Sequence, residues 1–153
     1  MNDQVQEELK KIFNGRFSTS ESTRANYARG EDTYDPVLSK AVVFPETNEE
    51  VSKILKLCNE YKTPVVPFGT GTSLEGNVVG NDKGITICLE KMNKILDVNV
   101  EDFDCRVQAC VTKEQLNDYL REDGVFFPID PGANAAIGGM ASTSASGTMA
   151  VKY

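Results

Sequence analysis

Two stretches of this 153-residue sequence combine glycine with hydroxyl side chains, a composition that suits the binding of a phosphate by the backbone. Of the 12 glycines, five lie between residues 69 and 84 and four between residues 132 and 147. The accompanying hydroxyl residues are Thr70, Thr72 and Ser73 in the first stretch and Ser142, Thr143, Ser144, Ser146 and Thr148 in the second. Glycine lets the backbone approach an anion and take positive φ angles that turn several amides toward one point. The sequence therefore predicts two loops that bind an anion through their amides.

The distribution of charge supports this interpretation. The formal net charge of −7 argues against nucleic acid or an anionic membrane surface as the main partner. Between residues 64 and 81 the only charged side chain is Glu75, and between residues 131 and 153 it is Lys152. Since neither loop contains a basic side chain of its own, a neutral cradle for a pyrophosphate is favoured over a clamp on a transferred phosphoryl group. One such loop alone would more often be a flexible connection, but two that each follow a predicted strand favour a ligand.

Several other chemistries are excluded by residue type. The chain contains no histidine, which removes Ser–His and Cys–His catalysis and the commonest transition-metal ligand. No Gly-Lys-Ser/Thr occurs, so there is no P-loop, and Leu74 stands where a dinucleotide-binding G-x-G-x-x-G requires its third glycine. We assign no catalytic residue and no metal ligand to this chain. Its four cysteines form no C-x-x-C pair and are interpreted as free, small apolar residues in buried stretches, which fits a reducing compartment: Cys58, Cys88, Cys105 and Cys110.

The elements that would position these loops follow from apolar periodicity. A helix is predicted over residues 1–13, and residues 14–36 have the composition of a loop. Two further helices begin at capping boxes, Thr47 with Glu50 and Thr112 with Gln115, and the second of these ends at Gly124. The predicted strands cover residues 41–44, 64–66, 85–89, 95–99, 106–109 and 125–127. The chain thus runs twice through a strand, a capped helix, a strand and a glycine-rich loop, which indicates an α+β or α/β fold with ligand loops at strand ends.

Each predicted helix carries an apolar stripe that we expect to be buried. The stripe residues are Val5, Leu9, Ile12 and Phe13 in the first helix, Val51, Ile54, Leu55, Cys58 and Tyr61 in the second, and Leu116, Tyr119 and Leu120 in the third.

With their flanks, the two loops resemble a known family. VVPFGTGTSLEG at residues 65–76 and FPIDPGANAAIGGMASTSASG at residues 127–147 are similar to the FAD-binding domain of the vanillyl-alcohol oxidase/PCMH superfamily. Within it, they most resemble D-lactate dehydrogenases of the cytochrome type and the flavin subunit of glycolate oxidase. The resemblance implies an α+β fold, a PCMH-type FAD-binding domain of two α/β subdomains that is incomplete at its C-terminus. It divides the chain into an N-terminal helix and lead-in, residues 1–33, and the truncated flavin domain, residues 34–153.

The resemblance also implies which residues bind FAD. The first loop would hold the pyrophosphate and part of the flavin, and the second would meet the same ligand from the opposite side, with a short helix near Gly138 and Gly139 directing its amino end at the phosphates. The candidate residues are Pro67, Phe68, Gly69, Thr70, Gly71, Thr72, Ser73, Gly76 and Asn77 in the first loop, and Pro131, Gly132, Ala133, Gly138, Gly139, Met140, Ala141, Ser142, Ser146 and Gly147 in the second. Relatives with a covalent flavin place a histidine about where Thr72 stands, so we expect FAD to be bound non-covalently.

By the same resemblance, the activity would be oxidation of a small D-2-hydroxy acid, D-lactate or glycolate, with hydride transfer from its C2 to flavin N5. A base outside this chain would take the proton, and an acceptor such as cytochrome c or a quinone would take the electrons. With no targeting signal or membrane span visible, we expect the cytoplasm or the mitochondrial matrix.

Related chains continue past Tyr153 into the rest of the flavin domain and a substrate-binding cap. We therefore expect a fragment, a truncated gene product or one piece of a split protein. Two alternatives to the dehydrogenase remain: an FAD-binding fragment or module that does no chemistry of its own, and an unrelated interaction domain with glycine-rich surface loops.

Overall fold

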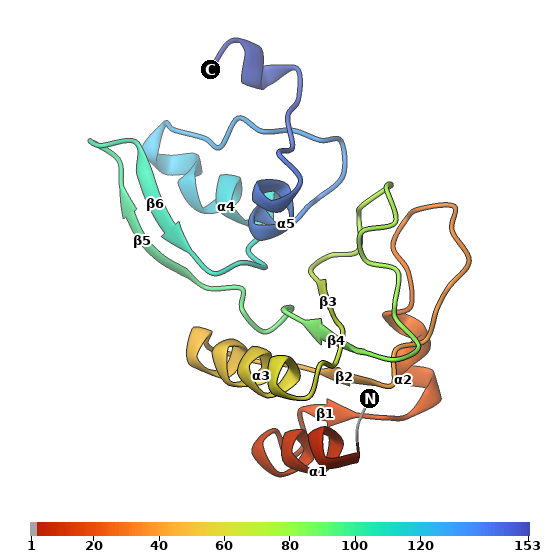
Figure 1. Ribbon diagram of the computed structural model, residues 1–153. Helices are drawn as coiled ribbons and strands as arrows, with labels where there is room; N and C mark the ends of the chain where they lie inside the picture. Colours follow the sequence, from red (N-terminus) through yellow and green to blue (C-terminus); the bar gives the residue numbers. More distant parts are fainter. Residues whose placement is uncertain (1–2) are drawn as a thin grey trace. The chain divides into compact units, whose positions relative to one another are not determined.

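The computed structural model describes residues 3–153 and divides the chain after Lys91 into two compact units (Figure 1). The first unit is a four-stranded sheet with three helices. Its elements are α1 (Asp3–Ile12), β1 (Phe17–Ser18), α2 (Glu21–Asn26), β2 (Ala41–Val43), α3 (Asn48–Glu60), β3 (Val65–Phe68) and β4 (Ile85–Cys88). The lead-in expected over residues 1–33 contributes α1, β1 and α2 to this unit.

The sheet of the first unit has the order β1-β2-β4-β3. Strands β2, β4 and β3 run parallel, and β1 pairs antiparallel with β2. Strand β4 lies at the centre of the parallel part, and all of its residues are buried. Strand β3 begins one residue later than predicted and continues through Pro67 to Phe68. Because β3 is an edge strand, the missing N–H of Pro67 removes no hydrogen bond from the ladder.

One hydrophobic core lies between this sheet and two helices. Val5, Leu9 and Phe13 enter it from the α1 segment, while α3 contributes Ile54 and Cys58. Alternate strand residues complete it because side chains of a strand alternate between the two faces: Ala41, Val43, Ile85 and Ile87. Fully burying one large aliphatic or aromatic side chain stabilises a fold by roughly 1.5–3 kcal/mol, so these residues carry much of the stability of the unit.

In the first unit, two residues of the predicted helical stripes are exposed instead of buried. Ile12, the last residue of α1, and Leu55 in α3 both face solvent. In α3 the buried face runs along Ile54 and Cys58 and extends toward Leu57 and Tyr61. Leu55 follows Ile54 by one residue, a rotation of about 100° around the helix, which takes it away from that face.

The prediction of a loop over residues 14–36 is wrong in part. Phe17 pairs with Val43 in β1, and Ser20 begins α2 by accepting a hydrogen bond from the Thr23 amide over 3.2 Å. The composition of this stretch is polar and gives no periodic signal. The strand forms because β2 offers it a pairing edge, which is information from a distant part of the sequence.

Both predicted capping threonines are confirmed, but the reciprocal half of each capping box is not. Thr47 and Thr112 accept hydrogen bonds from the amides of Glu50 and Gln115, each over 3.2 Å. The Glu50 carboxylate, however, accepts from the Glu46 amide and from Arg16, and the Gln115 amide group donates to the Asn93 carbonyl. Both side chains therefore fasten more distant parts of the chain to the start of their helix.

The second unit is a hairpin followed by short helices. Its elements are β5 (Ile95–Asn99), β6 (Asp104–Val107), α4 (Lys113–Leu120), the 3₁₀ turn η1 (Arg121–Asp123), α5 (Ile137–Ser142) and the 3₁₀ turn η2 (Met149–Val151). Gly124 follows η1 with a φ of 72°, in agreement with the predicted end of the helix. The core of the unit centres on Val111, Leu116 and Leu120. Tyr119, which was predicted to belong to the same buried stripe as Leu116 and Leu120, is exposed.

Strands β5 and β6 pair antiparallel, with an irregular register between Ile95 and Asp97. Strand β6 covers Asp104–Val107, two residues earlier than predicted. Cys58, Cys88 and Cys110 are buried as expected, but Cys105 on β6 is exposed.

The predicted strand over residues 125–127 is absent from the structure, and its hydrogen bonds show why. The Phe127 amide donates to Oδ1 of Asn117 over 2.7 Å, and the Phe127 carbonyl accepts from Nδ2 of the same side chain over 3.3 Å. Because one asparagine of α4 satisfies both backbone groups, Phe127 needs no neighbouring strand. Val125 and Phe127 still pack against the core of the unit, which accounts for their apolar pattern.

No helix within residues 3–153 is both long enough and apolar enough to cross a membrane.

Candidate functional site

The first candidate site is the loop that follows β3, residues 69–77, which we call the first glycine loop. Gly71 and Gly76 take positive φ angles of 75° and 73°, so the chain turns twice where glycine is most easily accommodated. A Cβ at Gly71 would lie 2.8 Å from Cζ of Phe68, and one at Gly76 would lie 2.8 Å from the Tyr34 ring. Both glycines are therefore required by backbone conformation and by space.

The first glycine loop lies against residues 28–37 (Figure 1). Nearly all of this segment falls in the stretch that was predicted to be a loop, residues 14–36. The Glu31 amide donates to the Gly71 carbonyl over 2.9 Å. Beyond the loop, the Gly80 amide donates to the Ala28 carbonyl over 2.9 Å. Neither contact uses an amide of the first glycine loop as its donor. Sequence reasoning missed this support, since hydrogen bonds through backbone groups leave no signature in residue type.

Several amides of the first glycine loop are open. Among the residues that the structure describes, the amides of Gly69, Gly71, Thr72 and Ser73 donate no hydrogen bond. Gly71 itself is buried, while Gly69, Thr72 and Ser73 are half-buried and Thr70 is exposed. Backbone donors in a glycine-rich turn are the groups that a phosphate prefers. The arrangement therefore fits the predicted anion cradle.

Two side chains form the floor of this loop. Phe68 is buried beneath Gly71 and meets the ring of Tyr27 edge-on, with ring centroids 5.2 Å apart. The Tyr27 hydroxyl donates to Oε2 of Glu90 over 2.9 Å. Burial, and then this bond to Glu90, raises the pKa of Tyr27, so its hydroxyl remains a neutral donor. The Phe68 side chain thus packs beneath the loop. Because that side chain is buried, only the backbone of Phe68 could contact a ligand.

An acidic residue from a distant part of the sequence lies near the first glycine loop. Asp32, which lies 37 positions before Gly69 in the sequence, is buried in the segment that packs on the loop. Its carboxylate accepts hydrogen bonds from the amides of Gly30 and Tyr34 over 3.1 Å and 3.0 Å. These bonds satisfy the hydrogen-bonding capacity of the two carboxylate oxygens and hold them against the backbone of residues 30–34.

The second candidate loop, residues 131–147, has a different character. Gly132 has a φ of 88° and is exposed, and α5 begins at Ile137 as predicted. The amides of Ile137 and Gly138, however, donate to the carbonyls of Val111 and Ala109, each over 2.8 Å. Since the first two amides of α5 are occupied, a phosphate at this end of the helix would meet Gly139 and not the whole helix start. We therefore assign the amino end of α5 a smaller part in phosphate binding than the resemblance implies.

Asp130 joins the two ends of the second loop. A Cβ at Gly147 would lie 2.7 Å from the Asp130 carbonyl oxygen, and the Asp130 carboxylate accepts from the Met149 amide over 3.3 Å and the Thr148 hydroxyl over 3.4 Å. Pro131 and Gly147 are thereby brought together. The predicted acid-poor stretch begins one residue after Asp130, so a carboxylate does lie beside the loop. Each candidate loop therefore has a carboxylate close to it, Asp32 beside the first and Asp130 beside the second.

The remaining candidates differ in exposure. Met140 is buried in the second unit, so its side chain is a core residue. The hydroxyl of Ser142 donates back to the Gly138 carbonyl over 2.8 Å within the helix. Half-buried candidates are Gly76, Ala133, Gly138 and Gly147, and exposed candidates are Pro67, Asn77, Pro131, Gly139, Ala141, Ser142 and Ser146. That both loops contact one ligand stays a prediction.

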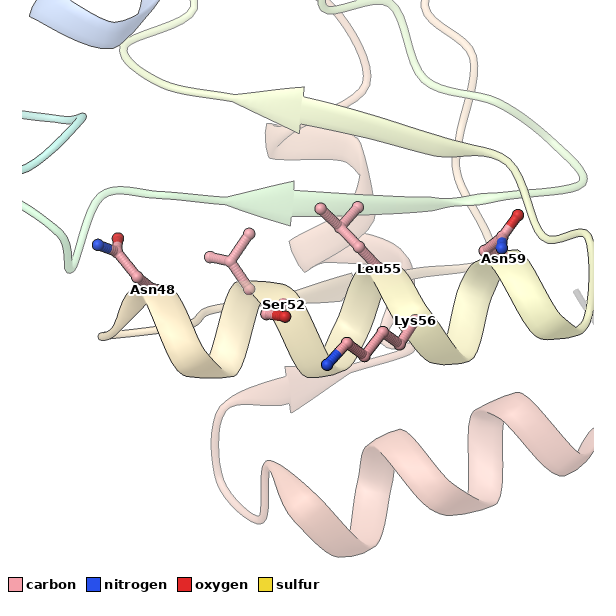
Figure 2. Close-up of a pocket in the computed structure, with 6 residues that line it drawn as sticks. Asn48, Ser52, Leu55, Lys56 and Asn59 are labelled. Atoms are coloured by element: carbon pink, nitrogen blue, oxygen red, sulfur yellow. The ribbon is translucent and has the colours of Figure 1, made fainter.

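Hollows elsewhere in the two units do not involve the glycine loops. The larger, about 450 Å³, lies along one face of α3 and is lined by Asn48, Val51, Ser52, Leu55, Lys56 and Asn59 (Figure 2). A smaller apolar one of about 150 Å³ lies within the second unit, beside Leu116, Leu120 and Phe127. Neither contains a residue of the candidate set, and we assign neither to the ligand.

Comparison with known proteins identifies the family. Residues 39–153 match the family described as FAD binding domain. The chain belongs to this family. The first glycine loop, the predicted anion cradle, therefore lies in a domain whose family is described as FAD binding.

Curated relatives and solved structures agree with this assignment. The chain is 46% identical over 136 residues to a probable mitochondrial D-lactate dehydrogenase of Danio rerio, covering 89% of this chain and 27% of that protein. It is 41% identical over 148 residues to a mitochondrial D-lactate dehydrogenase [cytochrome] of Arabidopsis thaliana, covering 95% and 26%. A structure of alkyldihydroxyacetonephosphate synthase matches the whole chain with a TM-score of 0.89 at 22% identity, covering 31% of that chain.

These matches confirm the predicted PCMH-type α+β fold. The chain spans about a quarter of the length of the two curated relatives.

Proposed function

We propose that this chain binds FAD non-covalently and forms the flavin-binding part of a dehydrogenase for a small D-2-hydroxy acid, D-lactate or glycolate. The observation that carries the proposal is that the amides of Gly69, Gly71, Thr72 and Ser73 donate no hydrogen bond within the described residues, in a chain of the FAD-binding domain family. The names of the relatives, D-lactate dehydrogenases from several organisms and a glycolate oxidase subunit from Bacillus subtilis, support the substrate class.

The residues of this chain bind and orient the cofactor. FAD, when bound, supplies a hydride acceptor at its N5 atom. The first glycine loop offers neutral donors to the pyrophosphate, and its rigid floor of Phe68 and Tyr27 keeps those donors in place. The proton of the substrate hydroxyl goes to a base outside this chain, since no residue of this chain is assigned that role. An acceptor such as a cytochrome or a quinone would take the electrons, in keeping with the cytochrome in the names of relatives.

The non-covalent mode follows from residue type. The sequence has no histidine, and Thr72 stands where the resemblance places the histidine of covalent flavins. Cys88 is buried in β4, and burial raises the pKa of its thiol to about 12, so it is a poor nucleophile toward a flavin. A reducing compartment, the cytoplasm or the mitochondrial matrix, fits the lack of a disulfide among the cysteines of the described residues.

The test is spectroscopic. The protein is expressed from its whole coding sequence and purified, and its absorbance is recorded with and without added FAD. We expect a flavin spectrum that bleaches on anaerobic addition of D-lactate or glycolate, with L-lactate as the matched control of opposite configuration. A protein that acquires no flavin from an excess of FAD would refute the proposal.

A second candidate is an FAD-binding module with no turnover of its own. The observation that favours it is the absence of histidine from the whole sequence, which leaves no ordinary general base near neutral pH. This candidate predicts a normal flavin spectrum that no hydroxy acid bleaches. The polypeptide of 153 residues by itself is expected to behave in this way.

A further inference from the structure

A turn built on Asp32 connects residues 28–37 to the first glycine loop. Asp32 is only 7% exposed, and each of its carboxylate oxygens accepts one backbone hydrogen bond. The Gly30 amide donates to Oδ2 over 3.1 Å and the Tyr34 amide to Oδ1 over 3.0 Å. Bonds to a charged acceptor are stronger than those between neutral groups, so this carboxylate fixes the path of the chain from Gly30 to Tyr34.

The turn brings two residues against one carbonyl of the first glycine loop. The Glu31 amide donates to the Gly71 oxygen over 2.9 Å. Gly30 packs so closely that a Cβ there would lie 2.4 Å from the same oxygen and 3.1 Å from the Ser73 oxygen. The Gly71 carbonyl oxygen therefore accepts a hydrogen bond from Glu31 and packs against the Cα of Gly30, which carries no side chain.

Holding this carbonyl also orients the next amide. No peptide bond is cis in the part of the chain described, so the bond between Gly71 and Thr72 is trans. In a planar trans peptide the C=O of one residue and the N–H of the next point in opposite directions. With its oxygen fixed on Glu31, the Gly71–Thr72 peptide points the Thr72 amide away from the Asp32 turn. Among the described residues, that amide donates no hydrogen bond.

We propose that Asp32 is a positioning residue for FAD binding. Through the turn it fixes the peptide between Gly71 and Thr72, so that the Thr72 amide is presented to a phosphate before the ligand arrives. Both oxygens of Asp32 are occupied by Gly30 and Tyr34, so it acts through the backbone and not by touching the cofactor. The inference rests on the proposed function and names a residue outside both glycine loops that controls the affinity.

The first measurement is FAD affinity in the protein expressed from its whole coding sequence. Asp32→Ala removes both acceptors, and Asp32→Asn keeps one of them. We expect the Kd for FAD to rise about tenfold in the alanine variant, with a smaller rise in the asparagine variant, because a misplaced donor loses one hydrogen bond to the phosphate. Asp35→Asn makes the same change of charge on an exposed side chain three positions away and is expected to keep the Kd within about twofold.

The second measurement is hydrogen exchange of the Glu31 amide in the FAD-free protein. We expect its protection to be lost in Asp32→Ala and kept in Asp35→Asn. A wild-type protein that does not bind FAD overturns the proposed function, whereas full protection of Glu31 in Asp32→Ala overturns the part assigned to Asp32. Loss of protection with an unchanged Kd also overturns the inference, because the turn would then not govern ligand binding.

A third variant tests the same contact from the other partner. Gly30→Ala leaves the carboxylate intact and places a Cβ against the Gly71 oxygen, so the peptide must move. We expect it to weaken FAD binding as Asp32→Ala does, at a temperature where circular dichroism shows all variants folded. If these variants unfold at lower temperature but bind FAD as tightly as the wild type below that temperature, the role of Asp32 is structural and the inference is wrong.

Discussion

Replacing Gly71 with alanine tests whether the first glycine loop is fixed by both backbone conformation and packing. The φ angle of 75° belongs to the left-handed region, where an L-residue costs roughly 1–2 kcal/mol. The new Cβ would also lie 2.8 Å from Cζ of the buried Phe68. Overpacking of this kind costs typically 1–3 kcal/mol, so we expect the free energy of unfolding to fall by about 2–5 kcal/mol.

Gly15→Ala is the matched control. Gly15 has a φ of 77°, but a Cβ there would meet nothing within 4 Å. This variant therefore carries the conformational cost of about 1–2 kcal/mol without the collision. The difference between the two variants isolates the contact with Phe68.

The assay is urea unfolding of wild type, Gly71→Ala and Gly15→Ala, followed by circular dichroism. The reasoning predicts that Gly71→Ala is the less stable of the two variants by at least about 1 kcal/mol. Equal stability of the two would refute the claim that Phe68 leaves no room for a side chain at Gly71. A Gly71→Ala protein as stable as the wild type would refute the assigned backbone conformation as well.

Three further predictions address other parts of the chain. The Arg16 guanidinium lowers the pKa of Glu50 from 4.5 to about 2 in the folded protein, so the stability that this pair contributes is complete above pH 4.5 and is lost as the pH falls toward 2; acid unfolding of Glu50→Gln, measured by circular dichroism, should depend less on pH in that window. Asn117→Ala leaves the partly buried backbone groups of Phe127 without this partner and should lower the free energy of unfolding by about 1 kcal/mol, while an unchanged urea midpoint would contradict the role given to this side chain. If the proposed non-covalent binding of FAD is right, acid precipitation should release all flavin into the supernatant, and yellow colour in the pellet would contradict this.

The elements that sequence predicted well are those whose signal is local. Thr47 and Thr112 start their helices as expected, because an N-cap is a contact between residues three positions apart. The central strand β4 was visible as an apolar stretch with one threonine, Thr86, and all four of its residues are buried. The positions of the glycine loops followed from the same reasoning, because each loop begins where a periodic pattern stops.

The elements that sequence missed depend on partners far along the chain. Strand β1 has two residues and forms only because β2 is there to pair with it. The strand predicted at Phe127 fails because a side chain of α4 takes its hydrogen bonds. The support of the first glycine loop by Glu31 and Asp32 uses backbone amides, which every residue type except proline possesses, so composition could not reveal it.

The packing of α1 has a consequence for where this domain can be cut. The family match begins at residue 39, yet Val5, Leu9 and Phe13 are fully buried against the sheet and α3. A recombinant piece that begins at residue 39 would lack three of the nine buried residues of this core, and apolar surface of the others would be exposed to water. It would also strip β1 from β2, whose hydrogen-bonding edge would then be open to strands of other molecules. Precipitation of such a piece would therefore report on the position of the cut and not on the quality of the flavin site.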